Sequence, residues 1–211
     1  MRRLQAPFGN WEPASLSEAV ALFAGRDVRW WVAGGIAVEL AVGRVLRPHG
    51  DLDVLVLRRD QLAVQRALAG WEWWAADPPG SLRPWSPGEF LPFGVHDVWC
   101  RPGPDRPWRV QVMLDESQGT EWVSRRDARV RRPVGALGAT SVAGVPFLVP
   151  EVQLYYKAKS PRPKDEVDFA AALPVLDGAQ RQWLIEALTR TYGRRADGRA
   201  RVHPWVARLQ A

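Results

Sequence analysis

The 211-residue sequence has one cysteine, only three lysines and no long apolar run. The single cysteine, Cys100, cannot form an internal disulfide, and without Cys or His companions it cannot complete a structural zinc site. No apolar run approaches the roughly 18 to 20 residues that a membrane-spanning helix needs, and the first residues lack the apolar segment of a signal peptide. We therefore expect a cytoplasmic protein that does not enter the membrane.

The composition also lacks any extreme that would exclude a folded domain. Hydrophobic residues make up 46% of the chain and charged residues 25%, which excludes wholesale disorder, collagen-like repetition and a coiled-coil rod. The 29 Lys and Arg residues exceed the 23 Asp and Glu residues, giving a net charge of +6. A nucleic-acid partner is therefore possible but not favoured, because the basic residues are spread along the chain and nearly all are arginines.

Hydrophobic periodicity, glycines and prolines predict a mixed α/β chain whose last part is helical. Helices are expected over residues 15–24, 36–42, 60–69, 150–158, 164–172, 180–191 and 203–209. Strands are expected over residues 28–33, 51–57, 71–75, 95–101 and 108–114, with a further β element at 130–134 or 140–148. We divide the chain into a catalytic part, residues 1–145, and a helical C-terminal part, residues 146–211. No oligomeric state is predicted.

The most informative local pattern is a diglycine turn followed by two aspartates. Gly34 and Gly35 end a short apolar strand and open a helix, where backbone N–H groups can approach an anion. Asp51 and Asp53 follow at the start of an aliphatic strand, and side chains at i and i+2 project from the same face. Acids in such a strand are costly unless paired or metal-bound. Two carboxylates on one face can bind Mg²⁺ together with substrate phosphates.

Together these residues resemble the signature of the nucleotidyltransferase superfamily, which includes polymerase-β-like enzymes and antibiotic adenylyltransferases. Over residues 30–56 the arrangement is Gly-Arg-x-x-Arg-x-His-x-Asp-h-Asp, where h is hydrophobic. This arrangement is similar to the aminoglycoside 2″-adenylyltransferase and lincosamide nucleotidyltransferase branch. Its residues are Gly43, Arg44, Arg47, His49, Asp51 and Asp53. The resemblance implies a nucleotidyltransferase-type mixed β-sheet with flanking helices.

A second, looser match covers the lysine-bearing helical segment near residues 150–169. Lys157, Lys159 and Lys164 fall within eight residues, although arginine supplies the positive charge elsewhere. A compact ammonium suits a phosphate, which favours a role in nucleotide binding. If Lys157 and Lys159 are both helical they point about 200° apart, so both cannot line one narrow site.

The resemblance also implies a third carboxylate on a later strand, where this chain has Gln111. Glutamine is neither an anionic Mg²⁺ ligand nor a useful proton acceptor. A hairpin centred on Pro104 would place Asp97 opposite Gln111 and on the same face, so Asp97 is our candidate for the missing carboxylate. Asp115 and Glu116 are the alternatives.

By resemblance, the chain is a Mg²⁺-dependent enzyme that moves a nucleoside monophosphate from ATP or another NTP to a hydroxyl of a small-molecule acceptor, with antibiotics among the candidates. Asp51, Asp53 and Asp97 would hold the metal and carry out catalysis. The expected nucleotide-binding residues are Gly34, Gly35, Arg47, His49, Lys157, Lys159 and Lys164. A solvent-exposed loop histidine is the alternative for His49. For Arg125, Arg126, Arg131 and Arg132, the alternatives are an anion patch and a solvated charge run.

The other class of function is a noncatalytic nucleotide-binding protein, or a toxin- or antitoxin-type relative that acts on RNA or a protein partner. It would have kept the fold and lost the third carboxylate. The position of a third acid near Asp51 and Asp53 distinguishes these hypotheses.

Overall fold

The computed structural model describes residues 5–6, 8–193 and 200–211. The helices are α1 (Leu16–Phe23), α2 (Gly34–Val42), α3 (Gln61–Ala67), α4 (Pro150–Lys157), α5 (Pro163–Ala172), α6 (Gly178–Tyr192) and α7 (Pro204–Gln210). The strands are β1 (Gln5–Ala6), β2 (Gly9–Asn10), β3 (Trp30–Val32), β4 (Asp53–Leu57), β5 (Glu72–Ala75), β6 (Arg83–Pro84), β7 (Asp97–Arg101), β8 (Val110–Gln118), β9 (Glu121–Val123), β10 (Arg131–Pro133), β11 (Gly138–Thr140) and β12 (Pro146–Leu148).

Capping residues and glycines that can be identified in the sequence determine where the helices begin and end. Ser15 caps α1 by accepting the Glu18 N–H, while the Glu18 carboxylate accepts the Ser15 N–H at 2.7 Å, so two orphan donors are satisfied reciprocally. Gly43 ends α2 in the left-handed region at φ +78°, a conformation that glycine adopts without a Cβ clash. These local signals explain why the predicted helices match the observed ones to within a few residues.

One mixed sheet organises the catalytic part, with the strand order β11-β12-β3-β4-β8-β7-β5-β6. Strand β4 is interior, pairing antiparallel with β3 and parallel with β8. Its residues from Val54 to Leu57 are all buried, because side chains on both of its faces are covered. The expected boundary at residue 145 precedes β12, which still belongs to the sheet, and the helical segment begins at Pro150.

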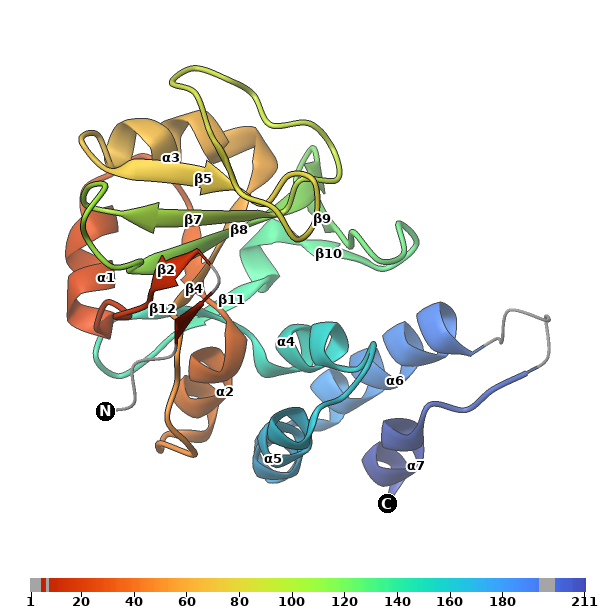
Figure 1. Ribbon diagram of the computed structural model, residues 1–211. Coiled ribbons are helices and arrows are strands. Elements are labelled where there is room, and N and C mark those ends of the chain that lie inside the picture. Colours follow the sequence, from red (N-terminus) through yellow and green to blue (C-terminus); the bar gives the residue numbers. More distant parts are fainter. Residues whose placement is uncertain (1–4, 7, 194–199) are drawn as a thin grey trace.

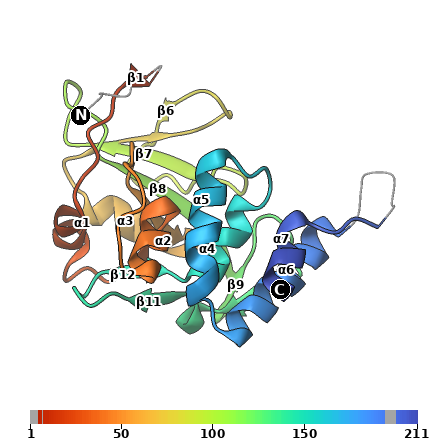
Figure 2. The same ribbon diagram turned by 90° about the horizontal axis from the view of Figure 1, so that it is seen from below.

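Figure 1 shows α4, α5, α6 and α7 gathered below the sheet, and Figure 2 shows α2 lying beside α4 and α5. The N-terminus of α2 therefore faces the helical part across the end of β4. No helix among the described residues is both long and apolar enough to cross a bilayer.

The strands depart from the sequence predictions in several places. Strands β1, β2 and β6 are not anticipated, and both of the alternative β regions form strands, as β10 and as β11 and β12. Strand β9 is not anticipated by the sequence pattern; it pairs with β8 and β10. The β7–β8 hairpin places Asp97 opposite Met113, and Trp99 opposite Gln111, so its centre is Asp105 instead of Pro104. The proline-rich turn extends further toward β8 than a symmetric hairpin about Pro104 would.

Candidate active site

The carboxylate of Asp53 lies directly against the diglycine turn. Asp53 is the first residue of β4 and Gly34 the first of α2. A Cβ added to Gly34 would overlap the Asp53 carboxylate oxygen Oδ2, and Gly34 has φ +68°, a conformation that favours glycine. The side chain of Gln153 on α4 accepts the Gly34 N–H at 2.8 Å. The predicted closeness of the diglycine turn and the aspartate is therefore present, and α4 contributes to it.

Three aspartates form what we call the carboxylate corner: Asp51, Asp53 and Asp97. Burial, followed by the negative charges of Asp51 and Asp97, raises the pKa of Asp53 to about 7, against the opposing effect of Lys157 and Lys164. Asp51 precedes the strand, contrary to the prediction that β4 begins there. Like charges held together in this way are relieved by a cation or by a shared proton.

Asp97 reaches the site in a register different from the predicted one. Its partner on β8 is Met113, two residues beyond the expected Gln111, because moving the hairpin centre by one residue moves the partner by two. A two-residue shift keeps a side chain on the same face. Asp97 is therefore a diagonal neighbour of Gln111, and the Gln111 side-chain amide donates to Asp97 Oδ1 at 3.2 Å.

The two alternative acids, Asp115 and Glu116, are already bonded to other side chains. Asp115 is 1% exposed and its Oδ2 accepts hydrogen bonds from Trp122 at 2.7 Å and Tyr156 at 2.6 Å. Burial raises its pKa, although the nearby Arg125 opposes the shift. Glu116 is paired with Arg58 at 2.6 Å. Neither acid is free to complete the carboxylate corner.

Arg47 and His49, predicted to bind nucleotide, contact protein groups. His49 Nε2 lies 2.8 Å from Glu39 Oε1, and Arg47 Nη1 lies 3.2 Å from His49 Nδ1. Arg47 also makes a two-pronged ion pair with Asp168 on α5, at 3.2 and 3.0 Å. A Cβ on Gly35 would overlap both Arg47 and His49. These two side chains thus brace the diglycine turn from behind, and binding of a nucleotide by them stays a prediction.

Lys157 is the centre of what we call the ion-pair network: Arg47, Lys157, Arg162, Asp165 and Asp168. Its ammonium lies 3.0 Å from Asp165 Oδ1 and 2.9 Å from Asp168 Oδ2, and its side chain is 6% exposed. Hydrogen bonds from Arg162 and Lys157 hold the pKa of Asp165 far below its usual range, although burial opposes this. The network joins the two sequence blocks that carry the resemblance, through Arg47 in one and Asp168 in the other.

A cavity of about 280 Å³ extends from Asp53 toward α4. Most of its charged lining residues are basic: Arg125, Arg126, Lys157, Lys159 and Arg162. Lys157 and Lys159 both line this cavity. The condition for separating them, that both are helical, is not met, because α4 ends at Lys157 and Lys159 follows outside the helix. Lys164 is exposed and lies near enough to Asp53 to lower its pKa.

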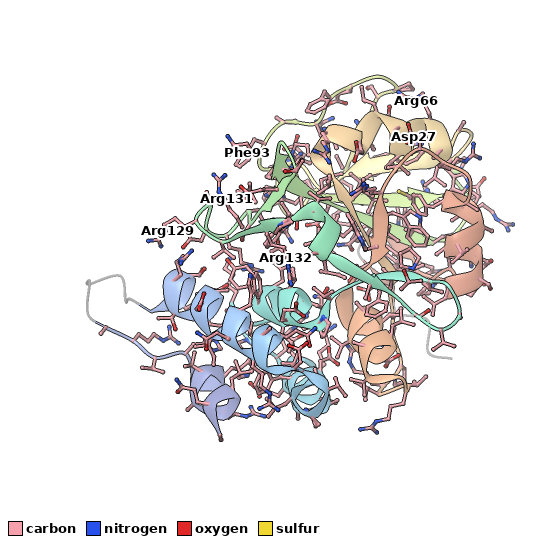
Figure 3. The ribbon with its side chains drawn as sticks, turned by 180° about the vertical axis from the view of Figure 1, so that it is seen from behind. Asp27, Arg66, Phe93, Arg129, Arg131 and Arg132 are labelled. Atoms are coloured by element: carbon pink, nitrogen blue, oxygen red, sulfur yellow. The ribbon has the colours of Figure 1, made fainter. Side chains whose placement is uncertain are left out.

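The sequence patterns missed some residues of this cavity and left others undecided. Gln153 was not anticipated, because nothing in a helical pattern signals that an amide will reach a glycine 119 positions away. The guanidinium groups of Arg125 and Arg126 lie 5.2 and 5.4 Å from the ring of Tyr156, which favours an anion patch over a solvated run. Arg131 and Arg132 point elsewhere; Figure 3 shows Arg131 on the outer side of the β9–β10 region, and Arg132 is paired with Glu151 at 2.7 Å.

The carboxylate corner suits a divalent cation with hard oxygen ligands, because its like charges lie near one another and the Asp53 carboxylate lines an open cavity. Within residues 5–6, 8–193 and 200–211, no three Asp, Glu, His or Cys side chains form a metal-holding group by themselves. A metal here would therefore share its ligands between the protein and a substrate. A larger cavity, about 460 Å³, lies between α1 and the β7–β8 turn and is lined by none of the predicted site residues.

Comparison with a family model gives a match to the first sequence block. Residues 15–73 match the family described as aminoglycoside-2″-adenylyltransferase. The matched segment contains Gly34, Gly35, Asp51 and Asp53, and it confirms the predicted resemblance. No curated protein sequence matches the chain significantly.

Comparison with solved structures extends the likeness to most of the chain. The crystal structure of ANT(2″)-Ia in complex with adenylyl-2″-tobramycin is 14% identical, with a TM-score of 0.53, and the match covers 83% of this chain and 97% of that one. The solution structure of the antibiotic-resistance factor ANT(2″)-Ia gives 16% identity, a TM-score of 0.53, and coverage of 84% and 90%. The crystal structure of the lincosamide antibiotic adenylyltransferase LnuA with lincomycin bound is 13% identical, with a TM-score of 0.54, and the match covers 78% of this chain and 100% of that one. The chain therefore has the fold of these nucleotidyltransferases.

Proposed function

We propose that the protein transfers a nucleoside monophosphate from an NTP, with ATP the first candidate, to a hydroxyl group of a small-molecule acceptor. One observation carries the proposal: the Asp53 carboxylate lies against the Gly34 turn, and burial together with the charges of Asp51 and Asp97 raises its pKa. The segment that matches an adenylyltransferase family supplies the turn and two of the three acids. Antibiotics are the acceptor class to test first, because the structure of ANT(2″)-Ia contains adenylyl-2″-tobramycin and that of LnuA contains lincomycin.

Asp51 and Asp53 would hold Mg²⁺, which supplies charge neutralisation on the phosphates and a more acidic acceptor hydroxyl. Asp97 lies close enough to Asp53 to raise its pKa, and we assign it the acceptor proton or a further metal contact. Its carboxylate is oriented by the Gln111 amide. Gln111 thus positions a carboxylate instead of replacing one.

The basic cavity fits the remaining phosphates. Lys159 and Arg162 lie at its rim, both exposed, where they can neutralise a polyphosphate. Arg125 and Arg126 line the same cavity on the side of β9. The Gly34 N–H is already bonded to Gln153, so the main contribution of the glycine is that its missing Cβ leaves room for the Asp53 carboxylate.

The test is release of pyrophosphate from each NTP in the presence of Mg²⁺ and a panel of hydroxyl-bearing antibiotics. Wild-type protein should release pyrophosphate with at least one pair of substrates. Asp53→Asn should reduce the rate by about a thousandfold or more, because loss of a metal-binding carboxylate removes stabilisation of the charge that develops in the transition state. An exposed turn variant, Asp105→Asn, serves as the control. NTP binding with no pyrophosphate from any pair would favour the noncatalytic alternative.

A further inference from the structure

The face of the sheet that carries Asp53 has a continuous row of side chains running away from the basic cavity. Asp53 is paired with Gln111 on β8, Gln111 with Trp99 on β7, Trp99 with Trp74 on β5, and Trp74 with Pro84 on β6. Directly paired residues project from the same face, and neighbouring strands lie about 4.8 Å apart. Trp99 therefore begins about 10 Å from Asp53 on the backbone, and Trp74 begins one strand further.

Trp74 and Trp99, which we call the tryptophan pair, are both only half-buried. Trp99 packs against Phe8, Trp11 and Trp108 with its ring in edge-to-face contacts at 5.1 to 6.0 Å. Its indole N–H donates to no group among the described residues. By contrast, Trp73 points to the opposite face and packs against Trp85. Packing thus fixes the position of Trp99 while leaving part of the ring available.

The geometry of nucleotidyl transfer places the two substrates on opposite sides of the carboxylate corner. In an in-line displacement, the attacking and leaving oxygens lie on opposite sides of the phosphorus. The basic cavity suits the leaving pyrophosphate. The acceptor would therefore approach from the opposite side, over β8, β7 and β5, where it meets the tryptophan pair.

The acids on this side are already neutralised. Glu72 is paired with Arg101 at 2.7 Å. Asp77 and Glu89 are both paired with Arg83, at 2.9 and 2.8 Å. A polycationic acceptor would find no unpaired carboxylate here among the described residues outside the carboxylate corner. An indole face, in contrast, stacks on the apolar face of a sugar or other ring.

We propose that the tryptophan pair is the acceptor subsite and that it selects a ring-bearing, hydroxylated molecule with at most one positive charge over a polyamine. This inference rests on the proposed function. It assigns specificity to stacking on Trp74 and Trp99, and it assigns no recognition role to charge on the acceptor side of the site.

The experiment compares glycosides that carry no amine, one amine or several amines, with pyrophosphate release as the readout in full-length protein. The ratio kcat/KM should fall as the number of amines rises. Trp74→Ala and Trp99→Phe should raise the KM for the preferred acceptor, by about tenfold for Trp74→Ala and less for Trp99→Phe, which keeps a ring. The KM for the NTP should not change. Trp71→Ala, three residues before Trp74 and lining the other cavity, is the matched control.

Acceptor binding is also measured by quenching of tryptophan fluorescence, which needs no turnover. Pyrophosphate release with polyamines as the best acceptors, or an unchanged acceptor KM in both tryptophan variants, would overturn the subsite and leave the proposed function intact. Absence of release with every acceptor would contradict the proposed function. In that case, binding of low-charge glycosides lost in Trp74→Ala would still support the subsite, and unaltered binding would overturn it.

Discussion

The carboxylate corner and the ion-pair network are adjacent and are built from the same residue types, yet they differ in how charge is arranged. In the network, each acid lies between bases: Asp168 is bonded to Arg47 and Lys157, and Asp165 to Lys157 and Arg162. In the corner, three acids lie near one another, and burial together with the charges of Asp51 and Asp97 raises the pKa of Asp53. Each acid of the network is paired with basic groups of the protein itself, whereas the repulsion within the corner is relieved only by a cation or a proton.

This difference assigns different roles to residues that look alike in the sequence. Completed buried ion pairs fix the geometry of the elements that carry them, and breaking one leaves an uncompensated charge. Unbalanced charges cost stability and are retained where a substrate or metal uses them. We therefore expect substitutions in the corner to affect activity and substitutions in the network to affect folding.

After Asp53→Asn, the largest effect on the rate should come from Asp97→Asn. If Asp97 takes the acceptor proton or completes the metal site, this change should lower kcat by about a hundredfold or more, because an amide can do neither. The KM for the NTP and the melting temperature should change little. Steady-state kinetics of pyrophosphate release measure this, and Asp105→Asn in the same hairpin is the control. A kcat within a factor of three of wild type would remove Asp97 from the chemistry.

Asp168→Asn breaks the network, and its effect should appear as lost stability. Asp168 is fully buried between Arg47 and Lys157, so removing its charge should cost about 3 to 5 kcal/mol of unfolding free energy. For a chain of this size that lowers the melting temperature by roughly 10 °C. Arg129→Ala is the contrasting variant, since Arg129 is 70% exposed and paired with Asp127 at the molecular edge seen in Figure 3.

Arg129→Ala should change the unfolding free energy by less than about 1 kcal/mol, the usual worth of an exposed pair. Equal losses in the two variants, measured by denaturant titration, would contradict the distinction between the two regions.

The pH dependence of stability should separate the two regions further. The pKa of Asp53 is about 7 in the folded protein and about 3.9 in the unfolded chain. Between these values the unfolded chain binds fewer protons, so the contribution of Asp53 to stability falls as pH rises and is lost above pH 7. Without metal, Asp53→Asn should therefore have a higher melting temperature than wild type at pH 8 and a similar one at pH 4.

Mg²⁺ provides the internal check on this pH effect. Adding it at pH 8 should raise the melting temperature of wild-type protein by a few degrees and that of Asp53→Asn by less. If the melting temperatures of the two proteins changed with pH in the same way, the charge of Asp53 would not destabilise the folded protein, and this prediction would be wrong.

The smallest effect should come from Lys159→Ala. Lys159 is exposed and lines the basic cavity, so its loss should raise the KM for the NTP about three- to tenfold with little change in melting temperature. Lys157→Ala should instead destabilise the fold, because it leaves Asp165 and Asp168 without their shared cation. Nucleotide titration and thermal unfolding together make this comparison. Similar behaviour of the two variants would show that neither region is specialised.

The sequence by itself determined the local parts of this site. Gly34 and Gly35, followed at close spacing by Asp51 and Asp53, are set by a strand, a turn and a helix in one continuous segment. Short-range geometry therefore predicts their closeness. The helical ends, fixed by caps and glycines, follow from the same kind of local chemistry.

Only the tertiary structure decided the rest. The hairpin register, which brings Asp97 beside Gln111, depends on how a proline-rich turn closes. The three lysines, equivalent in a sequence pattern, divide into a buried network member and two exposed residues because α4 ends at Lys157 and packs against α5. Pairing across four strands aligns the tryptophan pair with Asp53. Contacts between distant segments carry no local sequence signal, because they depend on packing and strand order.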